Sequence, residues 1–183
     1  MIPFSHRQKE EAPVFKIGDR VIYGSSGVCD VTYISTINID GIPKDKLYYI
    51  LCPYGKNESF IYAPVENCKV VMRKVLTLAE AEALIAEIPA LEPVEAGTDK
   101  QREQLYRECI KSCDCRRLIA VIKTLWLRSQ DRIKTGKKIS ALDERYLKLA
   151  EDALYGELAL ALGLEKSAVG PHIQRCMEAM LQV

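Results

Sequence analysis

The stretch Phe15-Lys-Ile-Gly-Asp-Arg-Val-Ile-Tyr-Gly-Ser-Ser-Gly-Val-Cys-Asp-Val31 decides the fold of the first part of this chain. Val21 and Tyr23 occupy alternate positions, as they do in a half-buried strand. The glycines at the two ends of Gly24-Ser-Ser-Gly27 permit the positive φ angles of a tight turn. The stretch therefore predicts two short strands joined at Gly18-Asp19 and a third strand after the turn.

Short strand-like segments continue to about residue 74. Asp40-Gly41 is a hairpin signal, and Pro53-Tyr-Gly-Lys-Asn57 is a second turn signal. The expected strands are 14–17, 20–23, 27–37, 46–51, 58–63 and 69–72. Five or six short strands in about 60 residues predict a small, strongly bent SH3- or Tudor-like barrel. Its expected core is Val21, Tyr23, Val28, Val31, Tyr33, Tyr49, Leu51, Ile61 and Val71.

The hydrophobic period becomes helical from Thr77. Thr77-x-x-Glu80 has the pattern of a capping box that opens a helix over 78–88, and Pro89 ends it. A second helix is expected over 99–111, and a third begins after Asp114 as N-cap and ends at Gly136. Two more are expected, from Ser140 to 162 with Gly163 as the C′ residue, and over 165–181 with Gly170-Pro171 as a candidate break.

The fold class predicted from these patterns is α+β, with a Tudor-like β-module followed by an all-α helical domain. At 183 residues and 48% hydrophobic composition, the chain can bury a core in each of two small domains. The expected parts are a loose tail over 1–13, the β-module over 14–74, a helix and linker over 75–97, and the helical domain over 98–183.

The net charge of +1 hides a strong asymmetry along the chain. Residues 75–97 carry a charge of −5, residues 98–148 carry +7, and residues 149–183 carry −3. A basic band between acidic segments is compatible with contact to phosphates, although amphipathic helices rich in Lys and Arg are also ordinary solvated faces. No apolar run reaches the length of a membrane span and no signal peptide is seen, so a cytoplasmic protein is expected.

The seven cysteines form an odd set, which predicts reduced thiols rather than a disulfide framework. Cys109, Cys113 and Cys115 lie close together in sequence, but their spacing is not that of a zinc site and the chain has only two histidines. We interpret the three as buried thiols and expect no metal and no cofactor. No carboxylate pair, nucleophile–base pair or phosphate loop stands out, so no enzymatic activity is predicted.

A segment near the C-terminus imitates a helix-turn-helix. Residues 158–175 combine a first helix, a turn at Gly163 and a second helix. Gly170-Pro171 interrupts the second helix, and only Gln174 and Arg175 could read bases there. Packing in the core is the alternative interpretation of this segment.

Several motifs, in order, resemble the CarD/CdnL family of bacterial transcription factors, whose first module is shared with transcription-repair coupling factors. The opening motif at Phe15 is followed by Ala63-Pro-Val-Glu-Asn67, Lys111-Ser-Cys-Asp114 and Val121-Ile-Lys-Thr-Leu-Trp126. Ser140-Ala-x-Asp-x-Arg145 and Gly156-Glu-Leu-Ala-Leu-Ala161 complete the series. Together they cover about residues 14–165.

The resemblance implies a monomeric, nucleoid-associated regulator with two partners. The β-module would bind the β subunit of RNA polymerase by pairing an exposed strand with a strand of the polymerase. The helical domain would lie against promoter DNA near the upstream edge of the transcription bubble, through phosphates and without strong sequence preference. A protein that binds only the open complex shifts the population of complexes toward it.

The site residues that follow from this comparison form two groups. The polymerase-binding group is Ser35, Ile37, Asn38, Phe60 and Tyr62. The DNA-binding group is Lys100, Arg102, Arg107, Lys123, Arg128, Arg132, Lys134, Lys137 and Lys138.

Two departures from the family pattern bear on function. Family members carry a Trp wedge about where this chain has Asp99, and a carboxylate can neither wedge between bases nor attract phosphate. Trp126 does not replace it, because its helical position assigns it to the core. Members also place arginines on the polymerase-facing strands, where this chain has Ile37 and Tyr62. One alternative is therefore an adaptor that binds polymerase without DNA contact, and the other is an autonomous helix-turn-helix repressor.

Overall fold

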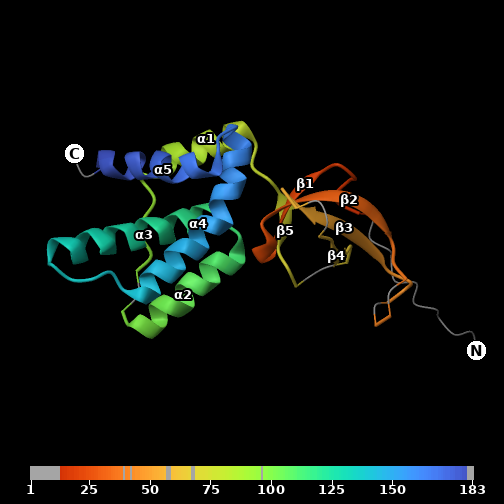
Figure 1. The fold of residues 1–183 in the computed structure, drawn as a ribbon, viewed down its shortest axis with the longest axis horizontal. Coiled ribbons are helices and arrows are strands. Elements are labelled where there is room, and N and C mark those ends of the chain that lie inside the picture. Colours follow the sequence, from red (N-terminus) through yellow and green to blue (C-terminus); the bar gives the residue numbers. More distant parts are fainter. Residues whose placement is uncertain are drawn as a thin grey trace, which may run out of the picture. The chain divides into compact units, whose positions relative to one another are not determined.

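The computed structural model describes residues 13–38, 40–41, 43–56, 59–66, 69–95 and 97–180. The expected tail, apart from its last residue Pro13, lies outside these ranges, as do Asn57, Glu58, Asn67 and Cys68 of the sequence motifs. Strands come first and helices follow, which confirms the α+β class (Figure 1).

The five strands form one sheet in the order β4-β3-β2-β1-β5, in which the pairs β1–β5, β2–β3 and β3–β4 are antiparallel. Their bounds are β1 Arg20–Tyr23, β2 Val28–Thr36, β3 Leu47–Pro53, β4 Ile61–Pro64 and β5 Met72–Lys74. The segment 14–17, expected as a strand, is instead a bend and a turn in which the Lys16 amide donates to the Asp19 carboxylate at 2.9 Å.

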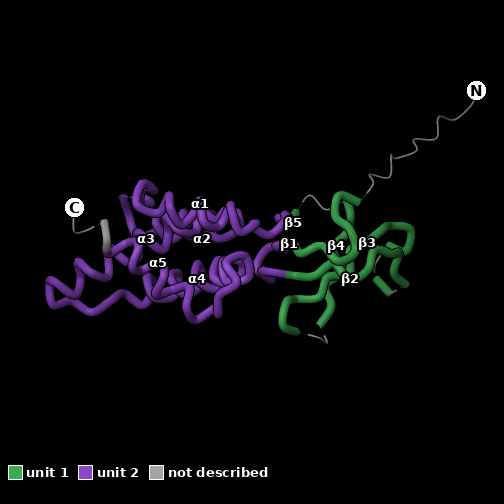
Figure 2. Tube along the Cα trace, turned by 90° about the horizontal axis from the view of Figure 1, so that it is seen from above, with its two compact units in different colours: residues 1–20, 29–70 green, residues 21–28, 71–183 purple. Residues whose placement is uncertain are grey.

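The chain divides into two compact units, coloured separately in Figure 2. Unit 1 comprises residues 1–20 and 29–70, and unit 2 comprises residues 21–28 and 71–183. Unit 2 thus includes the β1–β5 pair together with all five helices. The boundary that the sequence places after residue 74 stays a prediction.

In unit 1, β3 is the central partner of β2 and β4. Tyr49 pairs with Ile34 on one side and with Ala63 on the other, so its ring lies on the buried face. A bulge between Val31 and Tyr33 shifts the register of β2. Because one residue of slip reverses the facing of a side chain, Tyr33 is 61% exposed instead of belonging to the core as expected.

In unit 2, the 24–27 turn and the β1–β5 pair are closed by backbone hydrogen bonds. The Tyr23 amide donates to the Gly27 carbonyl at 2.9 Å, and the Gly24 amide donates to the Val71 carbonyl at 2.9 Å. Gly27 has a φ of 70°, as the turn prediction requires. Val71 precedes β5 and is 37% exposed, so its assignment to the core is wrong.

The helices are α1 Leu78–Glu87, α2 Asp99–Ser112, α3 Cys115–Lys134, α4 Ala141–Leu162 and α5 Lys166–Met180. The capping box at Thr77 and Glu80 is present, and Asp114 accepts from the Arg117 amide as N-cap of α3. Ser140 precedes α4 but makes no side-chain cap. α5 continues through Pro171, so the candidate break at Gly170-Pro171 is wrong.

One apolar core joins the five helices of unit 2. Tyr106, Leu118, Leu154 and Ile173 come from α2, α3, α4 and α5 and are at most 1% exposed. Trp126 is partly buried and packs against this core, as its helical position predicts. None of the helices in the described ranges is long and apolar enough to cross a membrane.

Candidate functional site

The strand β4 ends the sheet and leaves one edge open among the described strands. The Val65 amide donates to the Leu47 carbonyl at 2.9 Å, which fixes the hydrogen-bonding phase of this ladder. Because hydrogen-bonded and non-hydrogen-bonded pairs alternate in an antiparallel ladder, Ala63 and Ile61 bond to β3 while the backbone of Tyr62 faces the other way. The N–H and C=O of Tyr62 therefore point to the open edge.

Aromatic side chains lie beside this edge. Phe60 is 49% exposed and Tyr62 is 39% exposed. Tyr62 pairs with Ile50, and Ile50 pairs with Tyr33, so the three side chains form one row across the sheet. The row presents apolar surface next to free backbone groups, which is the chemistry that an added strand uses.

The other members of the polymerase-binding group lie at the end of β2. Ser35 and Asn38 are exposed, and the Ser35 hydroxyl donates to the Thr36 carbonyl at 2.9 Å. Ile37 follows the strand and its side chain is only 9% exposed, so only its backbone is available to a partner, and its place in the polymerase-binding group stays a prediction.

The cations of the basic band fall into three classes of exposure. Lys100, Arg107, Lys134, Lys137 and Lys138 are exposed, whereas Arg102, Arg128 and Arg132 are half-buried. Lys123 is buried.

The end of α3 and the loop that follows it carry three exposed cations, Lys134, Lys137 and Lys138. Arg132 Nη1 donates to the Lys138 carbonyl at 2.9 Å, and the Lys137 amide donates to the Arg132 carbonyl at 2.8 Å. These two hydrogen bonds tie the backbone of the loop to the end of α3. The exposed lysine side chains therefore extend from an ordered segment. Sequence reasoning identified the lysines of this loop but not the bonds that fix it.

Lys123 does not share this arrangement and is a correction to the DNA-binding group. Its side chain is buried, and its Nζ donates to the carbonyls of Ile88, Pro89 and Leu91 at 3.2, 3.0 and 2.6 Å. These carbonyls follow the C-terminal end of α1, where a cation satisfies acceptors that the helix leaves unpaired. Burial lowers the pKa of Lys123 from its ordinary value. The residue serves the packing of unit 2.

Asp99 is the first residue of α2 and is paired with Arg102 one turn later. Its side chain is 83% exposed. A carboxylate in the first turn complements the helix dipole, which explains its place there. The position expected for an apolar wedge is therefore solvent-exposed, and a carboxylate occupies it.

Arg73 is a residue whose role the sequence did not reveal. On β5, it forms a two-point ion pair with Glu157 of α4, at 2.5 and 2.7 Å, and it donates twice to the Cys113 carbonyl at 3.0 and 2.8 Å. Glu157 is completely buried as a side chain and also accepts from the Leu76 amide at 2.9 Å. The ion pair holds β5, which pairs with β1, against the helices of unit 2. The only signal in the sequence was a Glu inside an otherwise apolar stretch.

The cysteines Cys109, Cys113 and Cys115 are buried in unit 2. Burial raises the pKa of all three thiols, that of Cys115 to about 12. Cys113 adopts a left-handed conformation with a φ of 52°, at the turn between α2 and α3. Among the described residues, no group of three or more His, Cys, Asp or Glu side chains is placed to hold a metal ion.

Two family models match the chain. The model described as CarD-like/TRCF RID domain matches residues 15–76, and the model described as CarD, C-terminal domain matches residues 81–174. The chain belongs to the CarD/CdnL family. This is a family of non-enzymatic, RNA-polymerase-interacting transcription factors.

The bounds of the two CarD family models bear on the strand β5 and on the segment that imitates a helix-turn-helix. The first model ends just after β5, so the strand that carries Arg73 belongs to the CarD-like module by sequence and to the helical unit by packing. The second model ends at residue 174, inside α5. The segment that imitates a helix-turn-helix therefore lies almost entirely within the CarD C-terminal domain. Its second helix buries Val169, Ile173 and Met177 in the core.

Proposed function

We propose that this CarD-family protein binds the β subunit of RNA polymerase by adding a polymerase strand to the open edge of β4. The observation that carries the proposal is the free backbone of Tyr62, whose N–H and C=O face away from β3. An edge that exposes a donor, an acceptor and an aromatic ring offers both the main-chain affinity and the side-chain specificity of strand addition. Phe60 extends the apolar surface, and Ser35 and Asn38 complete the proposed contact as exposed polar groups.

The helical domain is the proposed DNA-contacting part. The exposed cations Lys100, Arg107, Lys134, Lys137 and Lys138, with the half-buried Arg102, Arg128 and Arg132, would meet backbone phosphates and confer little sequence preference. Contact with upstream promoter DNA would bias polymerase toward the open complex. The protein would act as a monomer associated with the nucleoid.

A second candidate function is an adaptor that binds polymerase without touching DNA. The observation that favours it is Asp99, which places a carboxylate at the start of α2 and pairs with Arg102. With Asp99 at this position, no aromatic side chain is available there to wedge between bases. The ion pair also uses part of the hydrogen-bonding capacity of Arg102, one of the cations that would contact phosphate. The two functions share the β4 edge and differ only in the helical domain.

The experiment that tests the polymerase contact uses the full chain, because truncation near residue 76 would separate Arg73 from Glu157. Tyr62→Pro removes the outward N–H without removing a bond to β3, and Tyr62→Val keeps the N–H while removing the ring. Affinity for the purified lobe of the polymerase β subunit is measured by calorimetry. We expect Tyr62→Pro to weaken binding more than Tyr62→Val does. Equal affinity of the native protein and Tyr62→Pro would contradict strand addition at β4.

A further inference from the structure

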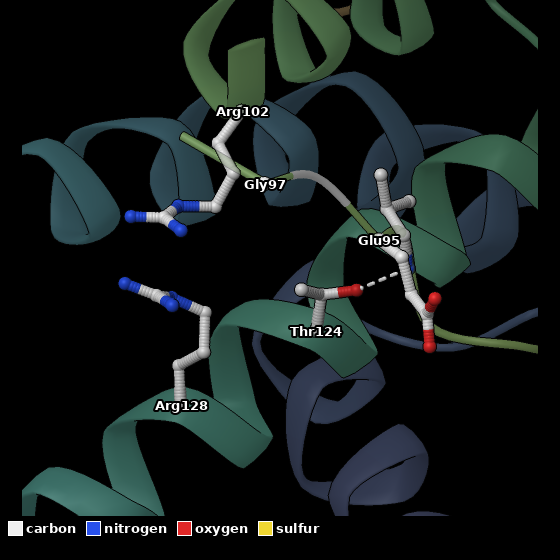
Figure 3. Close-up of a pocket in the computed structure, with 6 residues that line it drawn as sticks. Glu95, Gly97, Arg102, Thr124 and Arg128 are labelled. Atoms are coloured by element: carbon white, nitrogen blue, oxygen red, sulfur yellow. Dashed lines mark hydrogen bonds between the residues drawn. The ribbon is translucent and has the colours of Figure 1, made fainter. Parts of the chain in front are cut away.

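A pocket of about 590 Å³ lies within unit 2, between α2, α3 and the segment that precedes α2. This volume falls within the range of roughly 300–1,000 Å³ that is usual for small-molecule sites. The lining residues are Val94, Glu95, Gly97, Arg102, Thr124 and Arg128. Figure 3 shows Arg102 of α2 and Arg128 of α3 facing each other across the pocket, with their guanidinium groups close together.

The two guanidinium groups are held in place by carboxylates. Arg128 donates from Nε to Asp143 at 3.2 Å, and its Nη2 lies 3.2 Å from the same oxygen. Arg102 pairs with Asp99 through Nη2. A guanidinium has five N–H donors in a planar fork, so neither pair uses all the donors of its arginine. The remaining donors converge on a shared space.

Two polar atoms in this region are buried without a partner in the described part of the chain. They are Nε of Arg102, whose side chain is 17% exposed, and the hydroxyl of Tyr106, which is fully buried. Burial raises the pKa of Tyr106; the positive charge of Arg128 lowers it, the negative charge of Asp143 raises it, and the positive charge of Arg102 lowers it. A buried donor without an acceptor costs about 1–3 kcal/mol. Such donors are therefore expected to meet an acceptor from outside the chain.

The other polar groups of the pocket leave this space open. The Thr124 hydroxyl accepts from the Val94 amide at 2.7 Å and donates to the Ala120 carbonyl at 2.7 Å. In Figure 3 the Glu95 carboxylate points away from the two arginines. In the described part of the chain, the two carboxylates beside the guanidinium pair, those of Asp99 and Asp143, are each ion-paired with one arginine, and the donors that remain are available to an anion.

We propose that this pocket binds a phosphoryl group between Arg102 and Arg128. A phosphoryl group has several acceptor oxygens and matches the paired forks of two arginines, which bind such groups by two parallel hydrogen bonds each. The group can come from a small phosphorylated molecule or from one phosphate of a DNA backbone. The proposal does not rest on DNA contact by the helical domain, because a free phosphate would occupy the same space.

The first arm of the test titrates the full chain with inorganic phosphate at constant ionic strength and follows heat or amide shifts. The variants are Arg102→Gln and Arg128→Lys, of which the second keeps a charge for the buried Asp143 and removes the fork. Arg116→Gln is the matched control, since Arg116 is exposed, pairs with Glu87, and belongs neither to the pocket nor to the proposed DNA-contacting group. Melting temperatures establish that each variant is folded.

The second arm measures affinity for a mixed-sequence duplex with the same proteins. Saturable phosphate binding that weakens about tenfold or more in both variants, and not in Arg116→Gln, would support the proposal with a small molecule as the source. If both variants lose more duplex affinity than the control does, while their binding of inorganic phosphate is unchanged, the proposal would be supported with the DNA backbone as the source of the phosphoryl group. Variants that match the control in both arms would overturn it. If the native protein binds inorganic phosphate through the two arginines but binds no duplex, the result would contradict the proposed DNA contact and would still support the phosphoryl-binding pocket.

Discussion

Arg73 and Glu157 lie 84 positions apart in sequence and form the most buried ion pair among the described residues of unit 2, with Nη1 2.5 Å from Oε1 and Nη2 2.7 Å from Oε2. Arg73 comes from the last strand of the CarD-like module, and Glu157 comes from the middle of α4. A bidentate pair of this kind is geometrically specific as well as strong. The β1–β5 strand pair is consequently a part of the helical unit.

We predict that Glu157→Gln lowers the free energy of unfolding by about 3–5 kcal/mol, because it leaves the Arg73 charge without its partner in a mostly buried site. Chemical denaturation followed by circular dichroism measures this. Lys166→Gln is the control, since the Lys166–Asp152 pair is more than half exposed on both sides and such pairs contribute about 0–1 kcal/mol. Similar losses in the two variants would contradict the structural importance of the Arg73–Glu157 pair.

We predict that Cys115 makes the protein less stable as the pH rises above 9. Burial, followed by the charge of Glu157, raises the pKa of its thiol from 9.0 to about 12. Between these values the unfolded chain has lost the proton and the folded chain has kept it, so stability falls with increasing pH, by at most about 1.4 kcal/mol per unit.

The measurement compares the native protein with Cys115→Ala, because other groups that titrate in this range cancel in the difference. The free energy of unfolding of the native protein should fall relative to that of Cys115→Ala between pH 9 and the alkaline limit of the experiment. Cys176→Ala, at a half-buried position, is the control. A difference that is constant with pH would show that Cys115 titrates alike in the folded and unfolded chains.

We predict opposite results for two sets of lysines. Lys123→Met should cost about 2–3 kcal/mol of stability, because it leaves three carbonyls near the end of α1 without their donor. It should not change the salt dependence of DNA binding. Replacing Lys134, Lys137 and Lys138 by Ala should leave stability nearly unchanged and should reduce the salt slope by up to about three units. An unchanged slope in the triple variant would exclude the loop from the DNA interface.

The helix boundaries were predictable because they are encoded locally. Thr77 with Glu80, Asp114 and Gly163 mark helix ends through bonds and backbone angles within a few residues. The continuation of α5 through Pro171 was not predictable in this way. There the burial of Val169, Ile173 and Met177 against the other helices outweighs the loss of one backbone bond.

Errors in the expected sites came from tertiary packing. Tyr33 was assigned to the core by strict alternation, which the bulge in β2 interrupts. Lys123 was counted as a surface cation because charge alone does not reveal that α1 ends beside it. Arg73 was passed over because its partner is distant in sequence. The open edge of β4, likewise, depends on strand order and could not be read from the residues of β4 alone.

We predict that Asp99→Trp lengthens the life of open complexes formed with a cognate polymerase. The substitution removes a carboxylate that repels phosphate and supplies a ring that can stack on a base, worth roughly 1–3 kcal/mol per base. Each 1.4 kcal/mol corresponds to about a tenfold longer lifetime. Asp99→Asn removes the charge without adding a ring and should have the smaller effect. Decay after heparin challenge measures this, and long-lived native complexes that neither variant alters would show that another residue acts as the wedge.

Hydrogen exchange of the Tyr62 amide, with and without the lobe of the polymerase β subunit, tests the central claim most directly. In the free protein this amide faces the open edge of β4 and should exchange fast, whereas the Ala63 amide, which bonds to β3, should exchange slowly. If a polymerase strand is added at this edge, saturation with the lobe should slow the Tyr62 amide by about a hundredfold or more, equivalent to at least about 2.7 kcal/mol. Protection confined to the helical unit, with Tyr62 exchanging as fast as in the free protein, would contradict the account.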